Sequence, residues 1–192
     1  MRLLLHICCA PCAIYPVDYL KEKGFAVSGY FFNPNIHPYT EWLKRKNTLA
    51  EYAREIDLKL IVDEDYRLEE FLRTVVYREN VRCRFCYLLR LRQAAGVAKK
   101  GGFAGFTTTL LVSPFQKHEL IRETGEAVAE EYGIPFYYFD FRPGFKEATA
   151  RSKEMGMYRQ QYCGCIYSEK ERYCPENRQK SKKPPGGGNR RI

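Results

Sequence analysis

Seven of the eight cysteines in this chain fall into three short clusters, and clustered thiols can bind metals or exchange electrons. The clusters are Cys8, Cys9 and Cys12 in LLLHICCAPC, Cys83 and Cys86 in VRCRFCYLLR, and Cys163 and Cys165 in QQYCGCIY. Buried structural thiols would be scattered singly, as Cys174 is. Because the clusters recur in three parts of the chain, we expect them to converge in space around a metal or redox centre.

The C-x-x-C pair of Cys83 and Cys86 begins a predicted helix, whose amide dipoles favour thiolates and therefore metal ligation. Zinc and iron–sulfur clusters usually take four ligands, and the adjacent Cys8 and Cys9 can supply the other two. Two adjacent cysteines reach the separate irons of a cluster more easily than they reach one ion. An all-sulfur ligand set favours an iron–sulfur cluster or zinc and excludes magnesium and calcium. A structural zinc in a loop at the sheet edge is the alternative.

The pair Cys163 and Cys165 flanks a glycine, and this spacing permits a strained disulfide that is easily reduced. Such a pair can store two electrons reversibly, and Gly164 supplies the backbone freedom that the small ring needs. Two other interpretations remain: the pair binds a second metal, or it is two unpaired thiols near a helix end. Cys12 lies four residues after Cys8, so on a helix it either faces the same site, where it binds a second iron, or only packs.

Alternating strand and helix patterns position these cysteines. Strands are predicted at 2–7, 25–32, 58–62, 103–111 and 135–141. Helices are predicted at 10–24, 39–56, 65–79, 83–100 and 113–133, with further helical segments up to about Arg172. Gly24 suits a left-handed C-cap, Ser113 suits the N-cap of helix 113–133, and Pro114 suits its first position. Strands separated by helices predict an α/β fold with a doubly wound, mostly parallel sheet.

The loops that follow the strands of such a sheet share one edge, which is where open α/β sheets bind ligands. Cys8, Cys9 and Cys12 lie in the loop after the first strand, at the position of a phosphate-binding loop. Neither G-x-G-x-x-G nor G-x-x-x-x-G-K-[ST] follows that strand. A nucleotide site at this loop is therefore disfavoured.

Other polar and aromatic residues follow the second, fourth and last strands on the same edge. They are His37, Tyr39 and Trp42; Thr107, Thr108, Thr109 and Ser113; and Asp140 and Arg142. The first two groups are candidates for binding a polar, ring-bearing ligand, although we expect His37 to be solvated in its loop. Asp140 is a candidate proton donor or metal ligand, and Arg142 is a candidate phosphate contact. A surface ion pair between these two residues is the alternative.

The composition predicts a single domain over residues 1–177 and a basic tail over 178–192. Hydrophobic residues make up 45% of the 192 residues, which is enough for a substantial core. The tail holds six Lys or Arg and no acid, which explains most of the net charge of +9, and its Pro and Gly content predicts disorder. This charge favours contact with phosphates or serves only solubility. The sequence shows no secretory signal and no membrane-spanning apolar run, so we expect a cytoplasmic protein without membrane contact.

Six motifs of this chain resemble those of one known family. CCAPC, FFNPNIHP, CRFCYLLRL, FTTTLLVSPFQ, DFRPGF and YCGCIYS occur in an order and spacing similar to those of QueH, the cobalamin-independent epoxyqueuosine reductase family. The resemblance runs from about Leu3 to about Glu171 and does not extend to the tail from about Arg178. It shows no departure at the six cysteines that matter to the family.

The resemblance implies a fold similar to the adenine nucleotide α-hydrolase (HUP-like) type. It also implies an activity in the last step of queuosine synthesis, in which the epoxide oxygen of epoxyqueuosine at the wobble position of tRNA is removed. The implied ligands of a [4Fe–4S] cluster are Cys8, Cys9, Cys83 and Cys86, and the implied redox-active pair is Cys163 and Cys165. One additional iron ion is allowed, with ligands among Cys12, Cys163, Cys165 and Asp140.

Deoxygenation of an epoxide takes two electrons and two protons and releases water, so this activity needs an external electron donor. A [4Fe–4S] cluster passes one electron at a time, and the dithiol or a second iron would supply the other. A second iron could instead act as a Lewis acid on the epoxide oxygen. Asp140 and Tyr162 are candidates for protonating the leaving oxygen. Tyr39, Trp42 and Phe115 are candidates for stacking on a nucleotide that is splayed out of the anticodon loop.

Two other classes of protein are compatible with parts of the pattern. A tRNA-thiolating transferase that uses ATP would need the phosphate-binding loop that this sequence lacks. A noncatalytic zinc module that binds RNA would be colourless and would hold about one zinc ion. Visible absorbance near 400 nm separates an iron–sulfur enzyme from the zinc module.

Overall fold

The computed structural model describes residues 1–174. In this part of the chain, four parallel strands form one sheet in the order β3-β2-β1-β4. The strands are β1 (Arg2–His6), β2 (Ala26–Phe31), β3 (Leu60–Val62) and β4 (Gly105–Thr108). The predicted domain boundary at residue 177 and the predicted tail over 178–192 lie outside the described residues.

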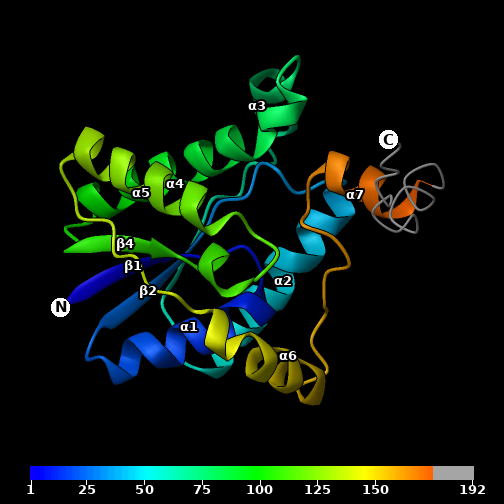
Figure 1. The fold of residues 1–192 in the computed structure, drawn as a ribbon. Coiled ribbons are helices and arrows are strands. Elements are labelled where there is room, and N and C mark those ends of the chain that lie inside the picture. Colours follow the sequence, from blue (N-terminus) through cyan, green and yellow to red (C-terminus); the bar gives the residue numbers. More distant parts are fainter. Residues whose placement is uncertain (175–192) are drawn as a thin grey trace, which may run out of the picture.

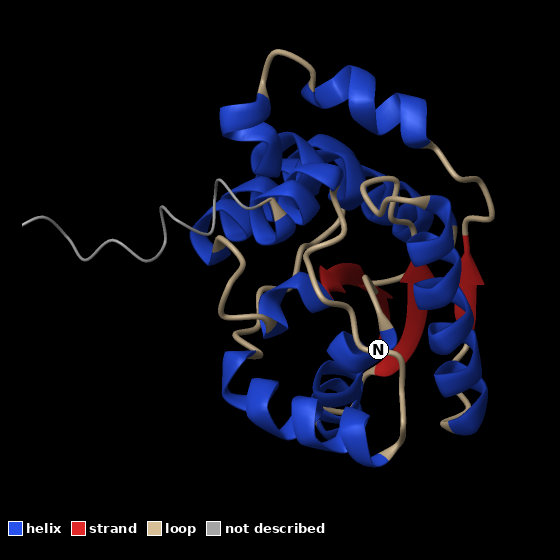
Figure 2. Cartoon of the chain, turned by 90° about the vertical axis from the view of Figure 1, so that its right-hand side faces the viewer, coloured by secondary structure: helices blue, strands red, loops and turns tan. Residues whose placement is uncertain are grey.

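Helices cover both faces of this sheet. They are α1 (Ala10–Glu22), α2 (Tyr39–Glu55), α3 (Leu68–Val75), α4 (Arg82–Lys100), α5 (His118–Tyr132), α6 (Phe145–Glu154) and α7 (Ile166–Tyr173). Short 3₁₀ helices follow α3, β4 and the aromatic segment 135–141; they are η1 (Glu79–Val81), η2 (Thr109–Val112) and η3 (Arg142–Gly144). Figure 1 shows α4 and α5 on one side of the sheet and α1 and α6 on the other, and Figure 2 shows the strands enclosed between helices. The predicted doubly wound, parallel α/β fold is therefore confirmed.

The central strand β1 forms the middle of the core. Leu3, Leu4 and Leu5 are completely buried, because helices cover both faces of the sheet and leave no polar side for alternation. His6, the last residue of β1, pairs with Tyr30 of β2 and Thr108 of β4. The loop that follows β1 therefore begins at the centre of the ligand-binding edge.

The predicted strand over 135–141 is wrong, because this segment makes only one bridge, between Phe106 and Phe136. Pro135 has no N–H to donate, and its carbonyl accepts from the Phe106 N–H at 3.0 Å. From Tyr137 onward, the aromatic rings of this segment pack against neighbouring rings. For example, the Tyr137 ring packs edge-on against Phe25, with 5.8 Å between the ring centres. The segment thus closes the sheet edge by side-chain packing rather than by a ladder.

Three element ends also differ from prediction. The predicted strand 103–111 ends at Thr108, whose hydroxyl accepts from the Leu110 N–H at 3.2 Å and turns the chain into η2. The predicted N-cap at Ser113 is wrong, because the Ser113 hydroxyl closes a local turn with the Phe115 N–H at 3.3 Å and α5 begins at His118. Helix α3 covers only Leu68–Val75 of the predicted 65–79. The expectation for Gly24 is confirmed, since its φ of 81° lies in the left-handed region just after α1.

Candidate active site

Three thiols meet at the carboxyl end of β1. The sulfur atoms of Cys8, Cys9 and Cys12 all lie within 4.8 Å of one another. Cys9 is the N-cap of α1 and Cys12 lies in its first turn, with Pro11 at a position where a missing N–H costs nothing. The amide groups at this helix N-terminus favour negative charge on the sulfur atoms. The loop is therefore a group of potential metal ligands, as the sequence predicts.

One of these thiols ionises more easily than the other two. Hydrogen bonds from the Cys12 and Cys9 thiols lower the pKa of Cys8, and the Thr109 hydroxyl adds a third donor at 3.4 Å from the Cys8 sulfur. Burial raises the pKa of Cys9, and the negative charge on Cys8 adds to this shift. Of the three thiols, Cys8 is therefore the one that most readily becomes a thiolate, the form that binds metals.

A buried hydrogen-bonded chain supports this loop from below. The His6 ring lies 3.1 Å from the Phe32 carbonyl through Nε2 and 2.8 Å from the Thr108 hydroxyl through Nδ1. Because a carbonyl only accepts, Nε2 carries the proton and Nδ1 accepts from Thr108. Burial lowers the His6 pKa to about 4, so the ring is neutral at pH 7. The hydroxyls of Thr108 and Thr109 thus serve the loop itself rather than pointing toward a bound ligand.

Helix α4 begins at Arg82 and carries the second pair of cysteines in its first two turns, as predicted. Its Arg90 is only 1% exposed and donates to Cys86 twice, from Nη2 to Sγ at 3.1 Å and from Nε to the carbonyl at 3.1 Å. No carboxylate pairs with Arg90 in residues 1–174. Burial disfavours the Arg90 cation, whereas ionisation of Cys86, Cys163 or Cys8 would stabilise it. Arg90 therefore contacts the Cys86 thiol and lies within electrostatic range of one thiol from each of the other two clusters.

The four predicted ligands do not form one closely spaced group among the described residues. Cys8 and Cys9 are grouped with Cys12, whereas Cys83 and Cys86 are not part of that group, and Cys86 contacts Arg90. A buried cation without an anionic partner is costly. An iron–sulfur cluster with thiolate ligands carries net negative charge and would supply that partner. The residues around Arg90 thus fit an anionic, sulfur-ligated centre better than a single ion held by Cys8, Cys9 and Cys12 alone.

The third pair of cysteines is carried by the segment 158–165, which Arg45 of α2 holds in place. The Arg45 guanidinium is 2% exposed and donates to the carbonyls of Cys163 at 3.1 Å and Tyr162 at 3.0 Å. It also pairs with Glu41 at 2.6 Å, and Glu41 in turn accepts from the Tyr158 hydroxyl. One buried ion pair thus fixes the backbone on which the predicted redox pair lies.

Gly164 brings this segment close to the loop that follows β2. Its φ is +124°, a conformation that other residues rarely adopt, and an added Cβ would lie 3.0 Å from Cγ1 of Ile36. The Gly164 carbonyl accepts from the His37 N–H at 2.8 Å. Cys163 is exposed, whereas Cys165 is buried and accepts from the Ser168 N–H as the N-cap of α7. Both thiols are free in this structure.

Two glutamines donate to the sulfur atoms, and no motif in the sequence indicates them. The Gln160 amide donates to Cys9 at 3.0 Å and to Cys12 at 3.4 Å. The Gln116 amide donates to Cys163 at 3.6 Å. The two buried arginines were also missed, although Arg90 is four residues after Cys86 and therefore on the same helix face. That spacing is the one signal that could have identified it.

The other predicted candidates differ in how accessible they are. His37 is 3% exposed and neither ring nitrogen has a partner within residues 1–174, so the expectation of a solvated ring is wrong. Trp42 is also buried, with the Tyr39 ring stacked on it at 5.8 Å. Tyr39 and Phe115 remain exposed and available for stacking on a base.

Asp140 forms an ion pair with Arg142, which was the alternative interpretation of these two residues. The Arg142 guanidinium donates to both carboxylate oxygens, at 2.8 and 2.6 Å. These bonds hold the pKa of Asp140 below its usual range, so the group is a carboxylate at neutral pH. Such a group can bind a metal but has no proton to donate.

Together these features define an α/β protein of the adenine nucleotide α-hydrolase type in which a thiol-rich loop occupies the position of a phosphate-binding loop. In particular, the chain belongs to the QueH family, because the family profile described as Epoxyqueuosine reductase QueH matches residues 3–171. None of the helices within residues 1–174 has both the length and the hydrophobicity needed to cross a membrane.

Comparison with known proteins supports this membership and the fold. A relative from Dehalococcoides mccartyi named Epoxyqueuosine reductase QueH is 41% identical over 176 residues, which is 92% of this chain and 97% of the relative. A relative of the same name from Thermotoga maritima is 36% identical over 179 residues, or 88% and 91% of the two chains. The crystal structure of a predicted subunit of tRNA methyltransferase from Methanocaldococcus jannaschii matches with a TM-score of 0.53 and 12% identity, covering 79% of this chain and 75% of that one. The last similarity concerns the fold alone.

Proposed function

We propose that this protein is an epoxyqueuosine reductase, an oxidoreductase that removes the epoxide oxygen of epoxyqueuosine at the wobble position of tRNA. The product would be queuosine, and the reaction would be the last step of its synthesis. One observation carries the proposal: the buried, carboxylate-free Arg90 donates to the Cys86 thiol and lies within electrostatic range of Cys8 and Cys163, so thiols from three distant parts of the chain share one cation. Because its substrate is tRNA, we expect the enzyme to act in the cytoplasm with an external electron donor.

The proposed cofactor is a [4Fe–4S] cluster, independent of cobalamin, with Cys8, Cys9, Cys83 and Cys86 as ligands. It would supply electrons one at a time. Arg90 supports this assignment, since a buried guanidinium stabilises an anionic centre. A second iron ion is also proposed, with ligands among Cys12, Cys163, Cys165 and Asp140. Asp140 is a carboxylate at neutral pH, the form that binds metals.

The chain's own dithiol can balance the reaction. Oxidation of Cys163 and Cys165 to a disulfide releases two electrons and two protons, and conversion of an epoxide to an alkene and water consumes the same number. The external donor would then reduce the disulfide. Cys163 is exposed and can meet the substrate, while Cys165 is buried beside it as the resolving thiol.

A proton source for the leaving oxygen is a further part of the proposal. The Tyr162 hydroxyl keeps its proton at neutral pH, because burial raises its pKa to about 12. It donates to the His37 carbonyl and lies on the same segment as Cys163. Tyr162 suits this role better than Asp140, whose pKa is lowered. Protonation of the oxygen by Tyr162 would require this bond to the His37 carbonyl to open.

The test is anaerobic iron and sulfide analysis combined with a deoxygenation assay on tRNA that contains epoxyqueuosine. We expect brown protein, conversion to queuosine, and loss of both iron and activity in Cys86→Ser. Cys174→Ser is the matched control, because Cys174 lies at the end of α7 and is expected to leave both unchanged. Colourless protein with about one zinc ion and no conversion would support the zinc module instead, and dependence on ATP would support a transferase. Either result would overturn the proposal.

A separate variant tests the dithiol. Cys163→Ser is expected to retain the sulfide and the four irons of the cluster, because Cys163 is not among the four proposed cluster ligands. Any loss of iron should be confined to the proposed second ion. It should lose turnover even with a chemical reductant. Unchanged turnover in this variant would exclude the dithiol as the two-electron store.

A further inference from the structure

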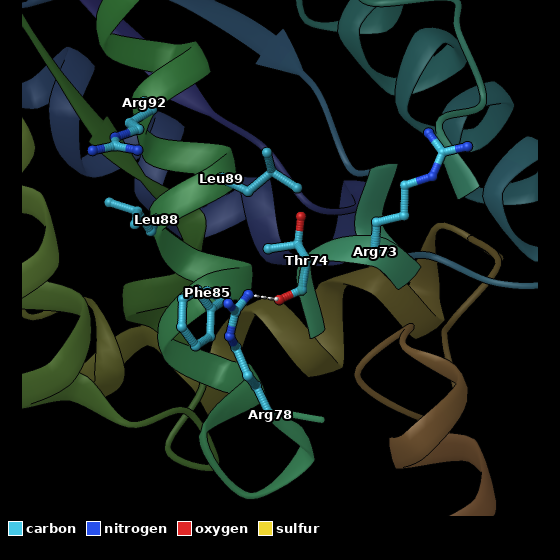
Figure 3. A pocket seen from close by; sticks show the side chains of 7 residues that line it. All are labelled: Arg73, Thr74, Arg78, Phe85, Leu88, Leu89 and Arg92. Carbon is cyan, nitrogen blue, oxygen red and sulfur yellow. Dashed lines mark hydrogen bonds between the residues drawn. The ribbon is translucent and has the colours of Figure 1, made fainter. Parts of the chain in front are cut away.

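A groove between α3 and the outer face of α4 is not used by the site described above. It has a volume of about 450 Å³ and is lined by Arg73, Thr74, Arg78, Phe85, Leu88, Leu89 and Arg92. Figure 3 shows Arg73 and Arg92 on opposite sides of this groove, with Arg78 beside Phe85 between them. The same helix α4 carries Cys83 and Cys86 in its first two turns, so the groove adjoins the candidate active site.

Two of the three arginines of the groove have no carboxylate partner among the described residues. Arg73 is exposed and has no hydrogen-bond or ion-pair partner within residues 1–174. Arg78 donates only to the Thr74 carbonyl at 3.2 Å, and its guanidinium lies 5.1 Å from the centre of the Phe85 ring. Arg92 is paired with Glu131 at 2.9 Å. Two guanidinium groups are therefore free to bind an anion, and their planar form suits phosphate.

A second cavity of about 520 Å³ adjoins the groove and shares Arg73 and Arg78 with it. Its remaining lining includes Tyr77, whose side chain is 95% exposed and makes no ring contact with other described residues. The backbone of Tyr77 has a φ of +60°, which is unfavourable for an aromatic residue. The fold therefore holds a tyrosine ring out into solvent, between two arginines, at a cost in backbone conformation.

We propose that this surface, formed by Arg73, Tyr77 and Arg78, docks the anticodon stem-loop of the tRNA substrate. The inference rests on the proposed function and extends it. Arg73 and Arg78 would bind backbone phosphates, and the Tyr77 ring would stack on an unpaired base of the loop. The Arg78 guanidinium lies 5.1 Å from the centre of the Phe85 ring, and Phe85 directly precedes Cys86 on α4, so a few nucleotides can span from this surface to the thiols. A stem-loop on this surface could therefore present its wobble nucleotide to the thiols.

An RNA occupant agrees better with this surface than an acidic peptide does. An acidic peptide would use the arginines but would leave the strained, exposed tyrosine ring without a stacking partner. Unpaired bases present flat faces next to phosphates, and the three side chains offer the matching combination. The surface therefore suits a ligand that has both negative charge and aromatic rings.

The test is the affinity of the iron-loaded protein for an anticodon stem-loop RNA, measured by fluorescence anisotropy over a range of salt concentrations. Arg73→Ala with Arg78→Ala is expected to weaken binding and to reduce the salt slope by about 2, because two phosphate contacts are lost. Arg122→Ala, an exposed arginine of α5 outside the groove, is the control and should change neither quantity. An unchanged affinity and slope in the double variant would overturn the proposal.

Tyr77→Gly separates binding from folding. Glycine adopts a φ of +60° without strain, so this variant should be at least as resistant to denaturant as the wild type. It should nevertheless bind the stem-loop about 10-fold more weakly, while Tyr77→Phe retains affinity. Full affinity of Tyr77→Gly for the stem-loop would contradict the stacking role. The same conclusion would follow if polyglutamate displaced the RNA from the protein as effectively as the RNA displaces polyglutamate.

Failure of the proposed function would look different. In that case the wild-type protein would bind the stem-loop, and the arginine and Tyr77 variants would bind it more weakly, yet the wild-type protein would not convert epoxyqueuosine. If the docking inference alone fails, conversion proceeds and the variants keep wild-type affinity and the wild-type KM for tRNA.

Discussion

Replacement of Arg45 by methionine should remove a large part of the stability of this fold. Arg45 is 2% exposed and pairs with Glu41, whose side chain is 8% exposed, at 2.6 Å. Removal of one partner of a buried ion pair costs about 3–5 kcal/mol, because the other charge is left buried. The carbonyls of Tyr162 and Cys163 lose their donors as well, but the segment 158–165 can turn them toward water. We therefore expect Arg45→Met to lower the free energy of unfolding by about 3–5 kcal/mol.

Chemical denaturation of the metal-free protein, followed by circular dichroism, measures this difference. Arg122→Met is the control, because Arg122 pairs with Glu119 at a similar 2.7 Å while both side chains are about half exposed or more. Its cost should stay below about 1 kcal/mol. The double variant Glu41→Leu with Arg45→Met should recover part of the loss, since no unpaired charge remains. A loss in Arg45→Met that is no larger than in the control would refute the account of Arg45 and Glu41 as a buried ion pair in which each charge needs the other.

Three further predictions concern His37, Gly164 and Asp140. Burial lowers the His37 pKa from 6.5 to about 4, so between these pH values the unfolded chain binds a proton that the folded chain does not bind. The free energy of unfolding should therefore fall by at most about 3 kcal/mol as the pH drops from 6.5 to 4. Denaturation of His37→Gln at each pH should lack this part of the decline. Gly164→Ala should lower the free energy of unfolding by about 1–3 kcal/mol, because the φ of Gly164 is +124° and the added Cβ would lie 3.0 Å from a side-chain atom. Gly133→Ala should lower it by about 1 kcal/mol in the same denaturation series, because its φ is +62° but the space around it is open. Asp140→Asn should change stability by less than about 1 kcal/mol, because its ion pair with Arg142 is largely exposed, but should remove one iron per chain; iron content equal to wild type would exclude Asp140 as a ligand.

The parallel sheet was predictable because strand patterns alternate with helix patterns along the chain, and because β1 contains an uninterrupted run of leucines. The run from Leu3 to Ile7 has no alternation, which indicates burial on both faces, and both residues are completely buried. The segment 135–141 misled the prediction, since five aromatic residues in seven favour a strand as much as a packed aromatic edge. Only Pro135 warned against a ladder. Ser113 and Pro114 have the composition of a helix start, yet the hydroxyl of Ser113 serves a tight turn instead.

The cysteines of the candidate site were predictable because clustered thiols are rare, whereas their polar partners were not. Arginine and glutamine are usually exposed, so composition gives no sign that Arg45 and Arg90 are among the largest fully buried side chains. Only the four-residue spacing from Cys86 to Arg90 indicated a shared helix face. Gln160 contacts Cys9 across a separation of 151 residues, which no local pattern encodes. The pairing of Cys8 and Cys9 with Cys12 depends on the backbone of the first turn of α1. Such partnerships follow from tertiary packing and become visible only in three dimensions.

The separation between Cys9 and Gln160 also has a consequence for biosynthesis. At typical elongation rates, the ribosome needs about 10–30 s to add the residues that divide these two partners. For that interval the thiols of the nascent chain stand open to oxidants and to stray metal ions, without the amide and guanidinium groups that later surround them. The thiols of this loop therefore gain their full set of polar partners only after the segment around Gln160 has been synthesised.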